Sequence, residues 1–174
     1  MKHTLIALVE DKPGVLNRVS SLFRRRTFNI DSLTVGHTET EGISRMTIVV
    51  NSDEVDAERV VANLYKLVNV IQVDDLGRTA AVSRDLAMVK VSANSINRIE
   101  IMQLVDVFRA RIVDVANDSL IIEITGDEDK IDSFVDVLRP YGIIEMVRTG
   151  VVAMARGPQA LPDTTLSNTS SVAV

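Results

Sequence analysis

A short loop near the start of the chain carries residue types that could bind an α-amino acid. Asp11 and Gly14 lie in this loop, which joins an aliphatic run at residues 4–9 to a predicted helix at residues 13–25. The first N–H groups of a helix have no intrahelical partners and attract a carboxylate. Gly14 lets a ligand approach the backbone because it has no side chain. The carboxylate of Asp11 suits an ammonium group, so the loop could recognise both charged ends of an amino acid.

The residues around this loop favour an apolar ligand, although the loop also has a simpler explanation. Val15 and Leu16 follow directly and suit a branched aliphatic side chain. Pro13 is expected in the first helical turn, where its missing N–H costs nothing. A proline and a glycine before an apolar helix are also the ordinary way in which a helix begins. The loop therefore predicts either an amino-acid site or a plain helix start, and local chemistry leaves both open.

The sequence offers few residues for catalysis or for binding a metal ion. It has no cysteine and two histidines, His3 at the start of the chain and His37 in a predicted turn. Neither histidine has another histidine or a cysteine at helical spacing, and neither suggests a Ser-His-acid triad. The sequence contains no glycine-rich loop of the kind that holds phosphates. We therefore expect no catalytic residues and no metal site.

The composition indicates a folded protein that does not act on nucleic acid. Hydrophobic residues make up 46% of the 174 residues, which is enough for a core, and the net charge is −5. Proteins that bind nucleic acid usually have a basic excess or stack bases on aromatic side chains, which are only 3% of this chain. The apolar run at residues 4–9 is shorter than the core of a signal peptide, and no run approaches the length of a membrane helix. We expect no nucleic-acid partner and no membrane partner.

Hydrophobic periodicity predicts six elements in the first half of the chain. Runs rich in β-branched residues indicate strands, and apolar residues three and four positions apart indicate helices. The second helix is expected to turn Val60, Leu64 and Val68 toward the core. The expected strands are residues 4–9, 29–36, 43–50 and 69–76, and the expected helices are residues 13–25 and 53–68. The order is β-α-β-β-α-β.

The same order of elements returns in the second half of the chain. Residues 77–84 are expected to form a short connection, and Asn97 and Glu100 are expected to open the next helix as a capping box. The expected strands are residues 85–92, 111–116, 119–125 and 142–147, and the expected helices are residues 97–108 and 127–139.

Two such units in series predict an α+β protein made of two tandem ferredoxin-like βαββαβ sandwiches. Each sandwich has both helices on one face of a four-stranded antiparallel sheet. We place the first domain at residues 1–77 and the second at residues 78–157. Residues 158–174 are rich in serine and threonine, so they are expected to form a disordered tail.

The first strand of each unit is apolar on both faces, which raises the question of what covers the sheets. Residues 5–9 are apolar at every position, and so are residues 86–89. Strands of this kind are usually covered on both faces, whereas the helices of a ferredoxin-like sandwich cover only one. The cover is either the other domain of the same chain or a second protein chain, and the sequence leaves both open.

Four motifs together resemble a known family. The loop motif at residues 8–16 is followed by Phe-Asn-Ile-Asp-Ser-Leu at residues 28–33 and Ser-Arg-Met-Thr-Ile at residues 44–48, and Arg-Thr-Gly-Val-Val occupies residues 148–152. The first three motifs resemble those of an ACT domain. The whole combination, which extends over residues 2–157, is more closely similar to the small regulatory subunit of acetolactate synthase, also called acetohydroxyacid synthase.

The resemblance implies a cytoplasmic regulatory subunit without catalytic residues of its own. Such subunits bind and activate a catalytic large subunit that uses thiamine diphosphate, Mg²⁺ and FAD, so none of these cofactors is expected on this chain. They also confer feedback inhibition by branched-chain amino acids, chiefly valine. The alternative is a free-standing ACT protein that senses an amino acid without such a partner.

The resemblance also implies where the effector binds. In the family, the effector lies between two ACT domains, held by the first loop of one and the start of the second strand of the other. The second strand, at residues 29–36, is expected at a sheet edge, where pairing with a second copy would satisfy its backbone groups and form a homodimer. The corresponding effector-binding positions are Asp11, Gly14, Val15 and Leu16 on the loop and Asn29 and Ile30 across the interface.

Overall fold

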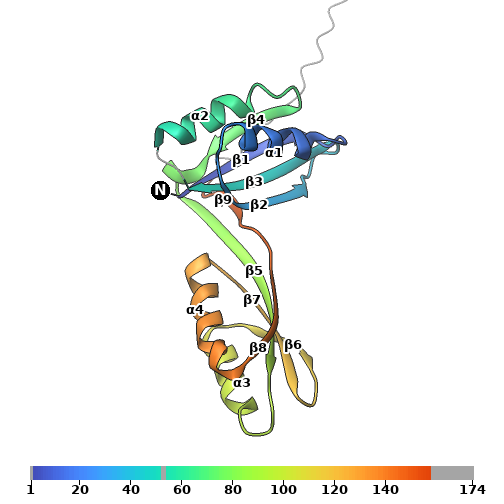
Figure 1. Cartoon of the computed structure of the whole chain (residues 1–174), viewed down its shortest axis with the longest axis vertical. Coiled ribbons are helices and arrows are strands. Elements are labelled where there is room, and N and C mark those ends of the chain that lie inside the picture. Colours follow the sequence, from blue (N-terminus) through green and yellow to red (C-terminus); the bar gives the residue numbers. More distant parts are fainter. Residues whose placement is uncertain (1, 52–53, 158–174) are drawn as a thin grey trace, which may run out of the picture.

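Two sheets follow one another along the molecule, and each carries two helices on one face (Figure 1). The computed structural model describes residues 2–51 and 54–157. This arrangement confirms the predicted pair of tandem ferredoxin-like sandwiches. The predicted tail at residues 158–174 lies outside the described residues, as does residue 53, the predicted start of the second helix.

The first unit has the predicted order of elements, and its second strand lies at a sheet edge. The strands are arranged β2-β3-β1-β4, with all neighbours antiparallel. The core lies between this sheet and the helices, where Phe23 of α1 and the β1 side chains Leu5 and Ala7 belong to one buried cluster. The elements are β1 Lys2–Glu10, α1 Val15–Arg25, β2 Ile30–His37, β3 Ile43–Asn51, α2 Glu54–Leu64 and β4 Val70–Asp75.

The second unit repeats the order and adds one strand. Its sheet is arranged β6-β7-β5-β8, and β9 pairs with the first part of β5. Its separate core is built around Phe134, Ile122 and Ile101. After the short 3₁₀ helix η1 Leu76–Arg78, the elements are β5 Ala81–Ser92, α3 Arg98–Val107, β6 Arg111–Val115, β7 Ser119–Gly126, α4 Glu128–Leu138, the 3₁₀ helix η2 Arg139–Tyr141, β8 Ile143–Arg148 and β9 Val152–Ala155.

The boundaries of the first two helices differ from the prediction. The first helix begins at Val15 because Gly14, which precedes it, has a left-handed φ of 85°. Pro13 therefore lies before the helix. The second helix ends at Leu64, and the chain then leaves the helical path through a tight turn. As a result Val68, expected to face the core, is 92% exposed.

The predicted capping box at the third helix is wrong. The side chain of Asn97 caps no N–H group of α3. Instead its Oδ1 accepts a hydrogen bond from the backbone N–H of Asn94 at 2.8 Å. Asn94 in turn accepts from the N–H of Ile96 at 2.8 Å. The two asparagines therefore close the preceding turn, a competing use of such side chains.

The predicted connection at residues 77–84 is also wrong, because its second half belongs to a strand. β5 begins at Ala81, and its first residues pair with β9, with Ala81 opposite Ala155 and Arg84 opposite Val152. β9 was not predicted. Its four residues show no alternation of apolar and polar side chains, so only its pairing with a distant segment identifies it.

The first sheet is covered on its helix-free face by the same chain. Ile6 is buried there against Leu76 and Ala153, with Val151 packed alongside. The Nη2 of Arg45 on β3 donates to the carbonyl oxygen of Ala153 at 2.6 Å. In Figure 1 the chain accordingly returns from the second unit to lie beside β2. Of the two alternatives for the cover, the structure therefore supports the same chain for the first unit.

The second sheet is more open. Met88 on β5 and Val147 on β8 lie opposite each other in register on the helix-free face and are 39% and 53% exposed.

No helix in the described part of the chain is long and apolar enough to cross a membrane.

Candidate functional site

The loop between β1 and α1 holds its shape through backbone hydrogen bonds. The N–H of Asp11 donates to the carbonyl of Gly42 at 2.8 Å, which ties the loop to the β2–β3 turn, and the N–H of Val15 donates to Lys12 at 3.3 Å. A Cβ at Gly14 would meet nothing within 4 Å, so the space beside this backbone is open. No side chain caps the first turn of α1 and none of its residues is acidic, so the N–H groups of this turn other than that of Val15 can receive a carboxylate.

The loop side chains differ in what they offer a ligand. The carboxylate of Asp11 is exposed and lies 3.3 Å from Nδ1 of His37. Leu16 is 46% exposed and presents an aliphatic surface beside the loop. Val15, by contrast, is only 5% exposed and lies in the core of the first unit. Its side chain therefore anchors α1, and a ligand could meet only its backbone.

Polar contacts fix both sides of the loop. Glu10 accepts a hydrogen bond from Nδ2 of Asn69 at 2.6 Å and pairs with Lys12 at 3.0 Å. The Asn69 hydrogen bond, and then the Lys12 hydrogen bond, hold the pKa of Glu10 below its ordinary value. Asn69 also accepts from the guanidinium of Arg18. Glu10 is thus already paired, which leaves Asp11 as the exposed acidic group of the loop.

The two remaining predicted site residues lie at the other end of α1. Asn29 is exposed just before β2, and its Nδ2 donates to Oδ1 of Asp31 at 3.2 Å. Ile30 packs against the core of the first unit. Because α1 has 11 residues, it separates these positions from the loop by about 16 Å. Within one chain, the structure therefore brings the loop residues together and leaves Asn29 and Ile30 apart.

His37 is a residue at the loop that the sequence did not indicate. It was expected in a turn, but it is the last residue of β2 and pairs with Ser44 on β3. Its contact with Asp11 depends on how the β2–β3 hairpin packs beside the loop. No local pattern carries that information.

The described residues offer little for other chemistry. They contain no group of three or more histidine, aspartate or glutamate side chains that could hold a metal ion.

The βαββαβ sheet, with an open glycine loop before its first helix and its second strand at an edge, has the arrangement expected of an ACT domain. A protein-family profile described as "AHAS small subunit-like ACT domain" matches residues 5–72. A second profile, "Small subunit of acetolactate synthase", matches residues 84–157. The chain belongs to the family of acetolactate synthase small subunits.

Relatives and a solved structure agree with this assignment. The chain is 55% identical over 157 residues to a probable acetolactate synthase small subunit of Archaeoglobus fulgidus, covering 90% of this chain and 98% of that protein. It is 50% identical over 159 residues to the acetolactate synthase small subunit of Mycolicibacterium smegmatis, covering 91% and 94%. The crystal structure of the acetolactate synthase small subunit from Thermotoga maritima matches with a TM-score of 0.84 at 41% identity, covering 91% of this chain and 99% of that one.

Proposed function

We propose that this chain activates a catalytic large subunit of acetolactate synthase and makes that enzyme sensitive to inhibition by valine. Membership of the small-subunit family supports a regulatory role. Thiamine diphosphate, Mg²⁺ and FAD then belong to the large subunit, and both subunits work in the cytoplasm. The effector site is the loop between β1 and α1, completed by the start of β2 from a second copy.

The two parts of this site lie at opposite ends of one edge strand, and this arrangement carries the proposal. β2 starts beside Asn29 and ends at His37, which contacts the loop at Asp11. Two copies of β2 paired antiparallel about a two-fold axis would place the start of one strand against the end of the other. Each loop would then face Asn29 of the other copy, and a homodimer would contain two equivalent sites.

The chemistry of the combined site suits a small aliphatic amino acid. The α-carboxylate would bind the free N–H groups at the start of α1, beside the open backbone of Gly14. The ammonium group would pair with Asp11, and the aliphatic side chain would contact Leu16. A ligand that touches both copies stabilises one dimer geometry, which is the basis for coupling its binding to a distant site.

Direct contacts connect β2, the strand at the proposed dimer interface, to the second unit. The backbone N–H of Val151, between β8 and β9, donates to Oγ of Ser32 on β2 at 2.9 Å. Arg45 on β3 holds the carbonyl of Ala153 at 2.6 Å. A shift of β2 at the proposed dimer interface would therefore be transmitted to the strands that lead into the second unit.

Reconstitution with the cognate large subunit tests the proposal. The chain should raise the rate of acetolactate formation and make it sensitive to valine. Gly14→Asp puts a carboxylate beside the ligand's carboxylate, and Asn29→Lys puts a cation near its ammonium group. Each variant should retain activation but raise the valine concentration for half-inhibition by roughly tenfold, the loss expected for one charge-assisted contact. Asn117→Lys, an exposed position in the β6–β7 turn, is the matched control and should leave both properties unchanged.

Three outcomes would count against parts of the proposal. If the wild-type chain neither activates the large subunit nor confers valine sensitivity, the regulatory role is wrong. If calorimetry then shows valine binding to the chain alone, a free-standing amino-acid sensor becomes the better assignment. If activation and inhibition are present but Gly14→Asp and Asn29→Lys inhibit normally, the effector site lies elsewhere.

A further inference from the structure

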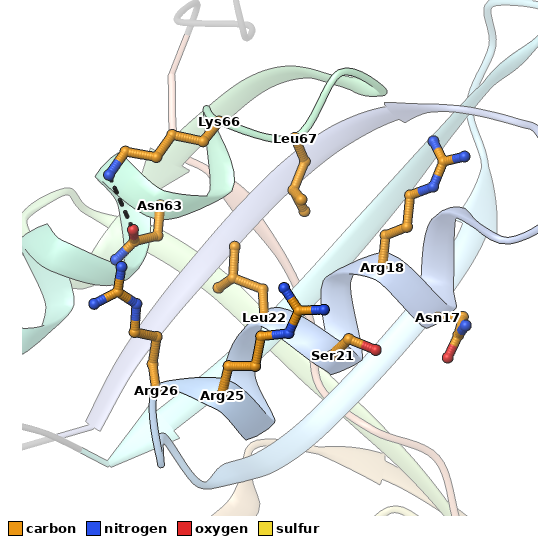
Figure 2. A pocket seen from close by; sticks show the side chains of 9 residues that line it. All are labelled: Asn17, Arg18, Ser21, Leu22, Arg25, Arg26, Asn63, Lys66 and Leu67. Carbon is orange, nitrogen blue, oxygen red and sulfur yellow. Dashed lines mark hydrogen bonds between the residues drawn. The ribbon is translucent and has the colours of Figure 1, made fainter.

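A cavity on the helical side of the first unit lies apart from the proposed effector site. It lies between one side of α1 and the end of α2 with the turn that follows, and its volume is about 460 Å³. Sites for small ligands commonly have volumes of this order. Figure 2 shows Leu22 and Leu67 at the centre of its lining, and both pack against the core of the first unit. The cavity therefore has an apolar floor on a rigid support.

The rim of this cavity is strongly cationic. Four of the nine lining side chains are basic, namely Arg18, Arg25, Arg26 and Lys66, and none is acidic. Figure 2 shows that they come from two segments, α1 with its end and the turn after α2. Arg25 and Arg26 are exposed, and neither forms an ion pair with another described residue. The chain as a whole has a net charge of −5, so this concentration of positive charge is a local feature.

The other two cations are held in place without being neutralised. Nζ of Lys66 donates to Oδ1 of Asn63 at 3.2 Å, and Arg18 donates to Oδ1 of Asn69. Asn63 is itself buried and fixed, because its Nδ2 donates to the carbonyl of Arg59 at 2.8 Å. Amide oxygens orient these groups but leave their positive charge uncompensated. Basic residues in the last turn of α1 complement the helix dipole, but that effect explains neither Arg18 nor Lys66.

We propose that this cavity binds a polyphosphate, either free or as part of a nucleotide. Guanidinium groups form paired hydrogen bonds with phosphate oxygens, and lysine supplies a further point charge. Four cations match the charge of a di- or triphosphate, and Ser21 and Asn17 add neutral hydrogen-bonding groups. A concave site with an apolar floor suits a small molecule better than the flat acidic surface of another protein. This inference goes beyond the proposed function and does not depend on it.

Calorimetry on the full-length chain tests the inference, with tripolyphosphate and a nucleoside triphosphate as probes. Binding should saturate at one molecule per cavity and weaken markedly between low and high ionic strength, because salt screens exposed charges. Arg25→Gln and Arg26→Gln should each weaken binding by roughly tenfold, the effect of one charged hydrogen-bonding partner. Arg24→Gln is the matched control: it removes the same charge from the same helical turn but does not line the cavity. It should change the affinity by about twofold at most.

The outcomes separate the possible ligands. Equal affinity for the two probes identifies the phosphate chain as the recognised group, and tighter binding of the nucleoside triphosphate adds the nucleoside; both results uphold the inference. It is overturned if neither probe binds, or if Arg24→Gln weakens binding as much as Arg25→Gln. It is also overturned if Arg25→Gln abolishes capture of the large subunit while no polyphosphate binds, because the cations would then serve a protein interface. Circular dichroism of each variant confirms that it is folded.

Discussion

Replacing Gly150 with alanine would disrupt the contact between the β8–β9 connection and β2, where the two units meet. An ideal Cβ at Gly150 would lie 2.6 Å from Oγ of Ser32 and 3.2 Å from the carbonyl oxygen of Leu33, and closer still to Oγ1 of Thr34. Next to it, the N–H of Val151 donates to the same Ser32 hydroxyl at 2.9 Å. An added methyl group must therefore push the β8–β9 connection away from β2.

The structure allows the size of this effect to be estimated. Forcing one methyl group into a close contact typically costs about 1–3 kcal/mol. Breaking the hydrogen bond between Val151 and Ser32 adds about 1 kcal/mol. Alanine also restricts the unfolded chain, which offsets about 0.4–1 kcal/mol. We expect Gly150→Ala to lower the free energy of unfolding by about 1–3.6 kcal/mol.

Urea unfolding of matched variants measures this difference. Gly36→Ala is the control, because Gly36 lies on β2, the strand that Gly150 faces, and a Cβ there would meet nothing within 4 Å. It should be as stable as wild type or slightly more stable. Hydrogen exchange gives a local readout: the amide of Val151 should lose protection in Gly150→Ala and keep it in Gly36→Ala.

A second substitution shows whether the close contact is the cause. Thr34→Ala removes the atom nearest to the added methyl group. It breaks no hydrogen bond, because Oγ1 of Thr34 is buried without a hydrogen-bond partner among the described residues. The double variant should recover about 1 kcal/mol relative to Gly150→Ala. Equal stability of Gly150→Ala and Gly36→Ala, or no recovery in the double variant, would refute the reasoning.

Two further substitutions probe the second core and the loop. Phe134→Ala should lower the free energy of unfolding in urea by about 3–5 kcal/mol, because its buried ring, 5.1 Å from that of Phe108, leaves a cavity; a cost near zero would contradict this packing. Asn69 and Lys12 lower the folded-state pKa of Glu10, so its carboxylate stabilises the fold above the unfolded pKa near 4.5, and this contribution is lost as pH falls through the lower folded value. The stability difference between wild type and Glu10→Gln should therefore shrink as urea titrations move from pH 7 to below that range; a difference that does not change with pH would count against this.

The elements of both units could be predicted because each carries a local signal. In α4, Ile131, Phe134 and Leu138 recur at helical spacing, and all three are buried. The edge position of β2 followed from the order of elements and is also observed. The predicted capping box at Asn97 failed, because a side chain that can close either a helix or a turn gives an ambiguous local signal.

The additional pairing between β5 and β9 could not be predicted in this way. Residues at the start of β5, such as Ala81, pair with Ala155 far along the chain. Neither segment has an alternating pattern that distinguishes a strand from a linker. The two strands form because they pair with each other and because Ala153 packs on Ile6, and both contacts exist only in the folded chain.

The sequence by itself determined the two-unit fold, the family and the residue types that the loop at Asp11 and Gly14 presents, because periodicity, turn residues and short motifs are local properties. Only the tertiary structure decided that Asn29 lies at the far end of β2 from that loop and that the end of the second unit returns to cover the first sheet. Both features depend on burial and hydrogen bonds between residues far apart in the chain. Such contacts gain their free energy only when the whole fold brings them together.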